Sequence, residues 1–359
     1  MSARYCIIAA GGTGGHMFPA QAVAEALLAE GWRVDLFTDD RGARFAGGFP
    51  DAVGRCVLPA ATTARGGILA KFMVPFTLLR GVIVALRSMR RARPDCVVGF
   101  GGYPTIPALG AAVCLRIPRM IHEQNGVLGR VNRLFARHVR HVACGTWPTA
   151  LPKGAQGVHV GNPVRQKVLD LQGAPYIAPG DYPLALVIMG GSQGARILSD
   201  VVPGALAALP DDLRKRLRVS HQARPEDLPR IEAAYAQAQI PADVAPFFDD
   251  IPRRINEAQL VISRAGASSV ADIGVIGRPA LLIPFAAAMD DHQRANAAAV
   301  VQTGGAIALS EAEFTIHNAT TAISDILSNP DRASAMAAAA LSGSRPDATQ
   351  ALVKLIQAL

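Results

Sequence analysis

Cysteine is scarce in this sequence, and its positions exclude several kinds of site. The five cysteines contain no C-x-x-C pair and lie mostly in apolar, strand-like runs: Cys6, Cys56, Cys96, Cys114 and Cys144. This pattern is typical of reduced core thiols in the cytosol, and it argues against a zinc site or a disulfide framework. We expect no signal peptide, because the apolar start is short and runs directly into a glycine-rich loop.

Charge is also limited, and it is unbalanced. Only 18% of the 359 residues are charged and 50% are hydrophobic, which is typical of a compact protein and excludes a largely disordered one. The net charge of +8 indicates an anionic partner such as a phosphorylated substrate, nucleic acid or acidic lipid, although a basic surface without such a partner is an equal alternative. The uncharged stretch 97–115 is broken by glycine and proline, so we interpret it as strand, loop and helix start rather than a membrane span.

Glycine, in contrast, is abundant at two corresponding places. The apolar run 5–10 leads into Gly11–His16, and the run 184–189 leads into Gly190–Arg196. A buried parallel strand that enters a helix through glycines offers unpaired amides and a helix dipole to a phosphate. Neither loop has G-x-G-x-x-G order or a following Gly-Lys-Ser/Thr, which argues against a dehydrogenase and a P-loop ATPase, although Asp39 and Asp40 could mimic a ribose-binding acid. We therefore predict two α/β domains with parallel sheets that face one another across a nucleotide-sized cleft.

Apolar runs alternate with helical patterns along most of the chain, as in parallel sheets covered by helices. The predicted strands are 6–10, 33–38, 96–100, 119–122, 141–144, 184–189, 217–220, 244–247, 260–263, 279–283 and 306–309. The predicted helices of the first half are 20–30, 68–91, 107–115 and 129–135. A break at Gly161-Asn162-Pro163 divides the pattern. We predict an N-terminal domain over 1–162, a C-terminal domain over 163–343, and a C-terminal segment 344–359 whose helix packs back on the first domain.

Polar residues follow successive predicted strands of the first half. Because the carboxyl ends of parallel strands meet at one crevice, His16, Tyr103, His122, Glu123 and Asn125 are predicted to share it. His16 could act as a general base or donate a hydrogen bond to a phosphate. Alternatively, it only caps its helix or hydrogen-bonds the turn. In the second half, the turn of small residues at 263–272 suits the close approach of a nucleotide, and Asp272 either accepts from ribose hydroxyls or only stabilises the helix dipole. A further polar group at 290–293 is predicted near the same crevice. The carboxylates of Asp290 and Asp291 lack a third ligand at metal spacing, so we interpret them as solvated loop acids.

The segment 68–91 departs from the α/β pattern, because it combines large apolar residues with basic ones and contains no acid. Such a helix can lie on an anionic membrane surface, and a buried connecting helix with solvated arginines is the alternative.

Several motifs together resemble the MurG family, the bacterial UDP-N-acetylglucosamine:lipid I N-acetylglucosaminyltransferases of glycosyltransferase family 28. They occur in the same order over nearly the whole chain: Gly11–Ala20, Gly101-Gly102-Tyr103, His122–Gly126, Gly161–Arg165, Gly190–Arg196 and Asp291-His292-Gln293. The resemblance implies a GT-B fold of two Rossmann-like domains. It also implies the inverting transfer of GlcNAc from UDP-GlcNAc to the C4 hydroxyl of MurNAc in lipid I, which gives lipid II and UDP in peptidoglycan synthesis.

The resemblance also assigns residues to roles. His16 is our choice of base, with His122 and Glu123 as alternatives. The implied donor-binding residues are Thr13, Gly14, Gly15, Asn125, Arg165, Gly191, Ser192, Gln193, Phe248, Ile251, Ala267, Ser268, Ser269, Asp272, His292 and Gln293. Among them, the resemblance places Arg165 near the uridine, the backbone at Phe248 and Ile251 against uracil, and His292 and Gln293 against the GlcNAc hydroxyls. The implied acceptor-binding residues are Gly14, Gly15, His16, Gly101, Gly102, Tyr103 and Asn125. The implied membrane contacts are Phe72, Phe76, Leu79 and Arg80. Asp272 departs from the family, which usually has a glutamate for the ribose hydroxyls.

The implied partners are UDP-GlcNAc, lipid I, the anionic inner surface of the bacterial plasma membrane, and other cell-wall synthesis and division proteins, with no nucleic acid. The protein is expected to be peripheral on the cytoplasmic face and to require no metal or other cofactor, because a glycine loop and its helix dipole can meet the charge of the departing UDP. Two alternatives stay open: a related enzyme with a diacylglycerol or soluble acceptor, and a non-catalytic nucleotide-sugar-binding or membrane scaffold protein.

Overall fold

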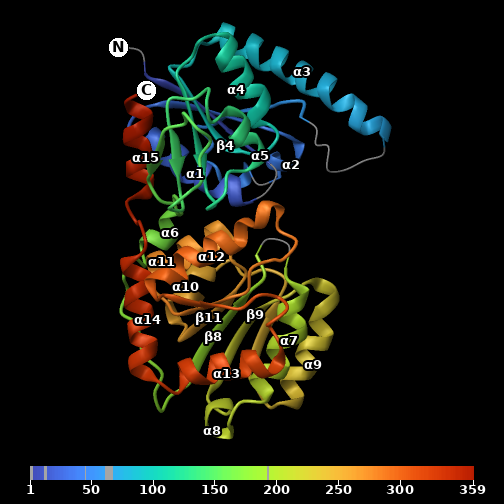
Figure 1. Cartoon of the computed structure of the whole chain (residues 1–359), viewed down its shortest axis with the longest axis vertical. Helices are drawn as coiled ribbons and strands as arrows, with labels where there is room; N and C mark the ends of the chain where they lie inside the picture. Colours follow the sequence, from blue (N-terminus) through green and yellow to red (C-terminus); the bar gives the residue numbers. More distant parts are fainter. Residues whose placement is uncertain (1–2, 12–13, 45, 61–67, 192–193) are drawn as a thin grey trace. The chain divides into compact units, whose positions relative to one another are not determined.

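The computed structural model of this chain describes residues 3–11, 14–44, 46–60, 68–191 and 194–359, with the backbone alone at 68–72 and at 289. The chain divides into two compact units, one of residues 1–165 and 346–359 and the other of residues 166–345. Each unit contains a parallel sheet with helices against it (Figure 1). The predicted pair of Rossmann-like α/β units is therefore confirmed.

The first unit contains a seven-stranded sheet in the order β3-β2-β1-β4-β5-β6-β7, and every neighbouring pair is parallel. Its strands are β1 (Tyr5–Ala10), β2 (Arg33–Thr38), β3 (Gly54–Val57), β4 (Cys96–Gly101), β5 (Arg119–Glu123), β6 (Val142–Cys144) and β7 (Gly157–His159). Its helices are α1 (Gly14–Ala29), α2 (Asp40–Ala43), η1 (Ala46–Gly48), α3 (Ile68–Arg91), α4 (Thr105–Cys114), α5 (Arg130–Phe135) and α15 (Ala348–Gln357). The strand order reverses between β1 and β4, and ligands of open α/β sheets bind at such a switch point.

Both faces of this sheet are buried, because alternate residues of each strand point to opposite sides. Ile8 of β1 joins one hydrophobic cluster with α1 and α15. The adjacent Ile7 joins a second cluster with α3, α4 and α5. The continuous apolar runs that predicted these strands therefore reflect burial on two sides.

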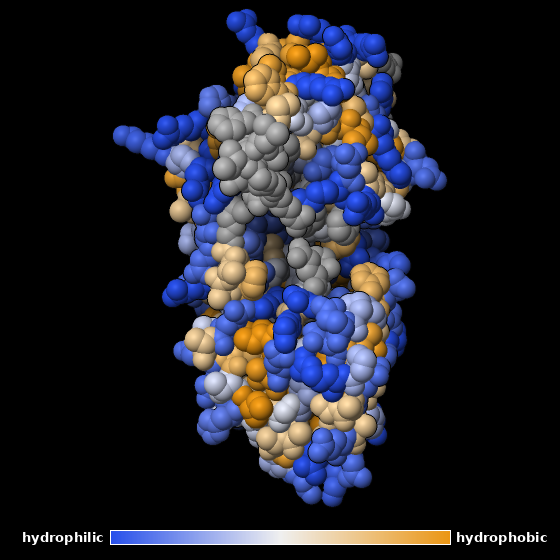
Figure 2. Space-filling view, turned by 90° about the vertical axis from the view of Figure 1, so that its right-hand side faces the viewer, coloured by the Kyte–Doolittle hydropathy of each residue, from blue (hydrophilic) through white to orange (hydrophobic). Residues whose placement is uncertain are grey.

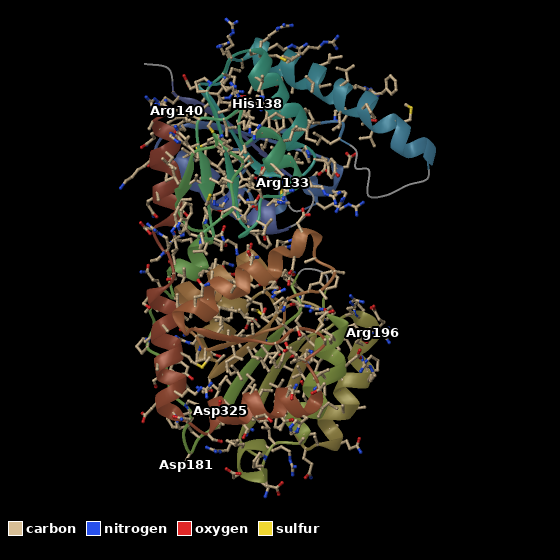
Figure 3. All side chains as sticks on the ribbon, viewed as in Figure 1. Arg133, His138, Arg140, Asp181, Arg196 and Asp325 are labelled. Atoms are coloured by element: carbon tan, nitrogen blue, oxygen red, sulfur yellow. The ribbon has the colours of Figure 1, made fainter. Side chains whose placement is uncertain are left out.

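The last helix of the chain, α15, belongs to the first unit. Leu352, Val353 and Ile356 are buried in the cluster that also contains α1. Arg140, which follows α5, donates to the carbonyl oxygens of Ala358 and Leu359 at 2.9 and 3.0 Å (Figure 3). The end of the chain thus completes the core around its beginning.

The second unit repeats the arrangement with a six-stranded parallel sheet in the order β10-β9-β8-β11-β12-β13. Its strands are β8 (Leu184–Met189), β9 (Leu217–Gln222), β10 (Ala242–Ala245), β11 (Leu260–Ser263), β12 (Ala280–Leu282) and β13 (Ala306–Ala308). Its helices are α6 (Gln166–Leu169), α7 (Arg196–Ala207), α8 (Asp211–Arg214), η2 (Pro225–Asp227), α9 (Leu228–Gln237), α10 (Ile251–Glu257), α11 (Ala267–Ile276), η3 (Met289–Asp291), α12 (His292–Thr303), α13 (Ile316–Leu327) and α14 (Pro330–Ser342). The strand order reverses between β8 and β11, at the glycine-rich loop predicted for the donor.

The differences from the predicted elements lie mainly at the edges of the sheets. The short strands β3 and β7 were not predicted, because edge strands need no continuous apolar run. The segment predicted as strand at 244–247 forms β10 at Ala242–Ala245, which ends before Pro246, a residue with no N–H for the ladder. Helix α1 begins at Gly14, earlier than the helix predicted from residue 20, so His16 lies in its first turn.

Candidate functional site

His16 lies in the first turn of α1, directly above the carboxyl end of β1. Its Nδ1 is 3.0 Å from the carbonyl oxygen of Gly11. In the tautomer that fits this contact, Nδ1–H donates to the carbonyl and the basic lone pair is on Nε2. The residue is partly buried, and the contact with the loop orients its ring. This arrangement suits a histidine that accepts a proton at Nε2.

Two glycines after β4 allow this loop to pack against His16. Gly101 and Gly102 have φ values of +97° and +82°, in the left-handed region that glycine adopts without strain. A Cβ on Gly101 would lie 3.0 Å from Cδ2 and Nε2 of His16, and one on Gly102 would lie 2.5 Å from the Gly11 oxygen. The structure therefore brings His16, Gly101 and Gly102 together, with the half-buried Tyr103 next in the turn.

His122, one alternative base, is fully buried in β5. Its Nε2 lies 3.1 Å from the Gly161 carbonyl oxygen, and its Nδ1 lies 3.3 Å from Nε2 of Gln124. Burial lowers the pKa of His122 to about 4, so the ring is neutral near pH 7 and donates from Nε2 to Gly161. Both ring nitrogens are thus used inside the protein.

Glu123, the other alternative, is equally engaged. Its Oε1 accepts from the backbone and side-chain nitrogens of Asn125 at 3.1 and 3.0 Å. Its Oε2 accepts from the Gly129 N–H at 2.8 Å and from Nδ2 of Asn132 at 2.9 Å. The buried carboxylate therefore holds the turn that carries Asn125.

Three buried amides around this turn were not among the predicted site residues. Asn132 of α5 donates to the His122 carbonyl oxygen at 3.1 Å, Gln124 donates to that of Phe100 at 2.9 Å, and Asn162 donates to that of Gln124 at 2.9 Å. The side-chain oxygen of each of these three amides is buried without a hydrogen-bond partner among the described residues. A polar residue on the apolar face of the predicted helix 129–135 was the signal that could have identified Asn132.

In the second unit, the loop after β8 needs glycine for close packing. A Cβ on Gly190 would lie 2.3 Å from the backbone nitrogen of Ala195, and Gly191 has a φ of +75° with open space beside its Cα. Helix α7 begins directly after this loop, and its N-cap residue, Ala195, has no side-chain acceptor for the first amides. The first N–H groups of a helix have no partner within the helix, and they favour an anion. The predicted contacts Thr13, Ser192 and Gln193 lie outside the described residues.

The loop after β11 lies beside the loop after β8, because the two strands pair along Leu260–Ser263. Ala267, Ser268 and Ser269 form the first turn of α11, and Asp272 lies in its second turn. The N-cap is Gly266, which has no side chain with which to cap the helix. The first residues of α11 are small, and the sequence predicts that a nucleotide lies close to them. Ala267 is buried, and the Ser268 hydroxyl is buried without a hydrogen-bond partner among the described residues.

The Phe248 and Ile251 stretch follows β10. Phe248 is buried under the guanidinium of Arg254, which lies 4.0 Å from the ring centroid. Arg254 is held by Asp243 at 2.8 Å and by Asp250 at 2.7 Å. Ile251 opens α10. This ordered backbone is the one that the resemblance assigned to uracil.

Two further donor residues begin α12. His292 is its first residue, and the side-chain oxygen of the adjacent Gln293 accepts from the Phe285 N–H at 3.0 Å. The preceding Asp290 and Asp291 have φ values of +54° and +52°. In the described part of the chain, no three His, Cys, Asp or Glu side chains gather as metal ligands would.

Arg165, which the resemblance placed near the uridine, ends the first part of the first unit. Its guanidinium lies 4.8 Å from the centroid of the Phe18 ring in α1.

One face of α3 carries exposed apolar side chains. Met73, Phe76, Leu79 and Ile83 are 53%, 67%, 58% and 40% exposed and follow one another at helical spacing. Gly81, on the opposite face, packs so closely that a Cβ would lie 2.3 Å from the Pro59 carbonyl oxygen. Figure 2, which views the side toward which α3 projects in Figure 1, shows apolar atoms beside strongly polar ones. No helix among the described residues is both long and apolar enough to span a membrane. The predicted membrane contact Phe72 lies outside the residues whose side chains the structure describes.

Two doubly wound parallel sheets, each with a glycine-rich loop before a helix at its switch point, define a two-unit α/β protein of the nucleotide-binding class. Residues 6–144 match the glycosyltransferase family 28 N-terminal domain, and residues 185–352 match the family 28 C-terminal domain. The chain belongs to glycosyltransferase family 28.

Individual relatives agree with this assignment. The chain is 48% identical over 356 residues to a protein of Phenylobacterium zucineum, covering 98% of this chain and 97% of the relative. It is 46% identical over 358 residues to a protein of Caulobacter vibrioides, covering 99% and 98%. Both are named UDP-N-acetylglucosamine--N-acetylmuramyl-(pentapeptide) pyrophosphoryl-undecaprenol N-acetylglucosamine transferase. The crystal structure of Acinetobacter baumannii MurG is 31% identical and has a TM-score of 0.81 over the full length of both chains.

Proposed function

We propose that this chain transfers GlcNAc from UDP-GlcNAc to the C4 hydroxyl of the MurNAc sugar of lipid I, forming lipid II and UDP in peptidoglycan synthesis. The observation that carries the proposal is the match to two relatives of that name at 46–48% identity over nearly the whole of each chain. The glycine-rich loop after β8 and the two helices that begin at the switch point of the second sheet, α7 and α11, support a donor that bears phosphate.

In the proposed mechanism, His16 is the general base. Nε2 of His16 accepts the proton of the C4 hydroxyl while the hydroxyl oxygen attacks the anomeric carbon of GlcNAc. The bond from that carbon to the diphosphate oxygen breaks, its electrons leave with UDP, and the configuration inverts. The hydrogen bond between Nδ1 and the Gly11 carbonyl supports this role, because it orients the ring and stabilises the imidazolium that forms.

The departing UDP gains negative charge, which the N-terminal amides of α7 would stabilise without a metal. We propose that the start of α11 and the stretch from Phe248 to Ile251 hold the nucleoside, and that His292 and Gln293 contact the sugar. The proposal includes Thr13, Ser192 and Gln193 on the strength of the sequence resemblance alone.

On the acceptor side, the exposed apolar face of α3 supports contact with a lipid surface. We propose that Phe76, Leu79 and Arg80, with Phe72, rest on the anionic cytoplasmic face of the plasma membrane, where lipid I is found. The net charge of +8 favours this surface.

The test is release of UDP from UDP-GlcNAc by the purified protein in EDTA, with and without a short-chain lipid I analogue. Release that depends on the analogue is the expected result, and it would also establish that no metal is needed. Release that ignores the analogue would indicate hydrolysis or another acceptor. No release in either case would contradict the proposal.

The role of His16 is tested with His16→Ala. We expect kcat to fall by about 10²- to 10⁴-fold, the usual contribution of a general base, while UDP binding persists. His138→Ala is the matched control, because this exposed histidine is also in the first unit, after α5 (Figure 3). Unchanged turnover in His16→Ala would overturn the assignment.

A further inference from the structure

A pocket of ≈ 520 Å³ lies in the first unit, between the last turns of α3 and the amino ends of β1 and β2. Tyr5 and Arg33 are the first residues of those two strands. The residues proposed for catalysis follow the carboxyl ends of the strands, so this pocket lies at the opposite edge of the sheet. Its volume is in the range of small-molecule sites. We name it the amino-edge pocket.

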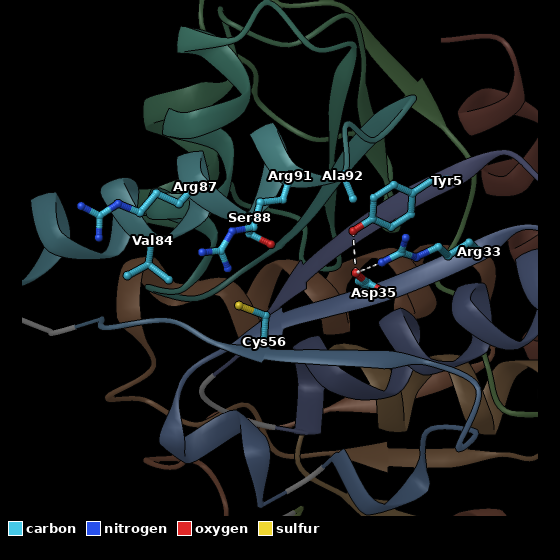
Figure 4. A pocket seen from close by; sticks show the side chains of 9 residues that line it. All are labelled: Tyr5, Arg33, Asp35, Cys56, Val84, Arg87, Ser88, Arg91 and Ala92. Atoms are coloured by element: carbon cyan, nitrogen blue, oxygen red, sulfur yellow. Dashed lines mark hydrogen bonds and ion pairs between the residues drawn. The ribbon is translucent and has the colours of Figure 1, made fainter.

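The strand side of the amino-edge pocket contains one carboxylate, that of Asp35, and it already interacts with Tyr5 and Arg33. Oδ2 of Asp35 accepts from the Tyr5 hydroxyl at 2.5 Å and lies 3.1 Å from the Arg33 guanidinium (Figure 4). Arg33 also lies 4.2 Å above the Tyr5 ring. Burial, with Asp35 as the second cause, raises the pKa of Tyr5, so its hydroxyl stays protonated and donates. The neighbouring Asp95 accepts the Tyr5 backbone N–H at 2.7 Å.

The α3 side carries positive charge that these carboxylates do not balance. Arg87 and Arg91, one helical turn apart, line the pocket together with Ser88, which lies between them in the sequence (Figure 4). Helix α3 contains no acidic residue, and Asp95, four positions after Arg91, accepts the Tyr5 backbone N–H. No ion pair of either is found within the described ranges. Two like charges at this spacing repel one another unless an anion lies between them.

The chemistry of the lining defines a ligand class. Two guanidiniums and a hydroxyl match a doubly charged phosphate group, which accepts several charge-assisted hydrogen bonds. The side chains of Val84, Ala92 and Cys56 form an apolar wall beside them. The volume exceeds that of a phosphate ion, which leaves room for the body of an ester.

We propose that the amino-edge pocket binds a small phosphate ester through Arg87 and Arg91, at a site separate from catalysis. The ester is either a soluble metabolite or the headgroup of an anionic lipid. The inference does not depend on the proposed transferase activity, because it concerns other residues at the other edge of the sheet.

The first test is calorimetric titration with glycerol 3-phosphate in the presence of excess UDP, which keeps the probe from the proposed donor site. We expect Arg87→Gln and Arg91→Gln each to weaken binding tenfold or more. Arg90→Gln is the matched control, because it removes the same charge from the same turn of α3. Arg90 is exposed and does not line the pocket. If all three substitutions weaken glycerol 3-phosphate binding equally, or if the unmodified protein does not bind it, the proposal of a soluble ligand is wrong.

A second arm tests the lipid source with phosphatidylglycerol vesicles. If the ligand is a headgroup, Arg91→Gln lowers co-sedimentation well below that of Arg90→Gln. If neither probe distinguishes Arg91→Gln from Arg90→Gln, the proposal is wrong.

Thiol labelling gives an independent readout that needs no variant. Cys56 lines the pocket, whereas the exposed Cys114 lies on α4 outside it. The probe that binds is expected to slow maleimide labelling of Cys56 several-fold and to leave Cys114 unchanged. Equal rates at Cys56 with and without that probe would contradict occupancy of the pocket.

Discussion

The Glu123 carboxylate receives four hydrogen bonds from three residues, Asn125, Gly129 and Asn132. Such a carboxylate acts mainly as a structural acceptor, because nearly all of its lone-pair capacity is used. It fixes the position of Asn125, which the resemblance assigns to the substrates. The side chain that the sequence offered as a base is thus better explained as the support of a binding residue.

Glu123→Gln is expected to destabilise the first unit by about 2 kcal/mol or more, because the new NH₂ group would face N–H donors in a buried site. Both tryptophans, Trp32 and Trp147, belong to the first unit, so denaturant unfolding followed by their fluorescence reports on that unit. Asp51→Asn, at an exposed position of the first unit, is the control and should change stability by less than about 0.5 kcal/mol. Lost activity at unchanged stability would instead indicate a direct catalytic role for Glu123.

The buried His122 makes the stability of the first unit depend on pH. Burial lowers its pKa to about 4, below the ordinary 6.5, so the unfolded chain takes up a proton at a higher pH than the folded one. The stabilising difference is present above pH 6.5 and is lost as the pH falls toward 4. Between pH 7 and pH 5 this histidine should account for roughly 2 kcal/mol of lost stability.

The measurement is the unfolding free energy from tryptophan fluorescence at pH 7 and pH 5. His122→Gln should lower stability at pH 7 and also reduce its pH dependence, whereas His138→Gln, at an exposed position, should not. An identical pH dependence in the unmodified protein and His122→Gln would rule out His122 as the titrating group.

At the scale of elements, α3 has two dissimilar faces. The face with Gly81, Ala85 and Met89 is buried, while the face with Phe76 and Leu79 is exposed. Large side chains on a helix surface normally face a core. Their exposure on a helix without acids is therefore best explained by a surface that covers them.

Changing Phe76 and Leu79 together to serine is expected to weaken co-sedimentation with anionic vesicles about tenfold or more, since each loses apolar area available for burial. Phe247→Ser is a close control, because Phe76 and Phe247 are both 67% exposed and Phe247 belongs to the second unit. If Phe247→Ser weakens binding as much, general hydrophobicity rather than α3 controls association.

At the scale of the whole molecule, the chain returns to its first unit after completing the second. Leu352→Ala removes a fully buried side chain from the cluster shared with α1 and is expected to cost about 2–5 kcal/mol. The unfolding transition detected by tryptophan fluorescence should move to a lower denaturant concentration, while the rates of hydrogen exchange in β8 and β11 stay unchanged. Lys354→Ala, exposed on the same helix, serves as the control. A loss of protection in the second unit as well would mean that the two units unfold together.

The sequence alone determined the fold class and the family. Its continuous apolar runs, such as Leu184–Met189, are a local signal, because a strand buried on both faces is apolar at every position. The glycine-rich loops are also local, since glycine is required where backbones approach closely, as Gly102 approaches Gly11. These signals survive in the sequence because each depends on neighbouring residues.

Only the tertiary structure decided what the polar residues contact. The order of residues does not show that His122 donates to the Gly161 carbonyl oxygen. It also does not show that the Glu123 carboxylate accepts a hydrogen bond from Asn132 of another element. The amino-edge pocket likewise joins Tyr5 to Arg91, which are remote in sequence. Burial and hydrogen bonding between distant segments set the charge state and the role of each group, and the fold alone brings those segments together.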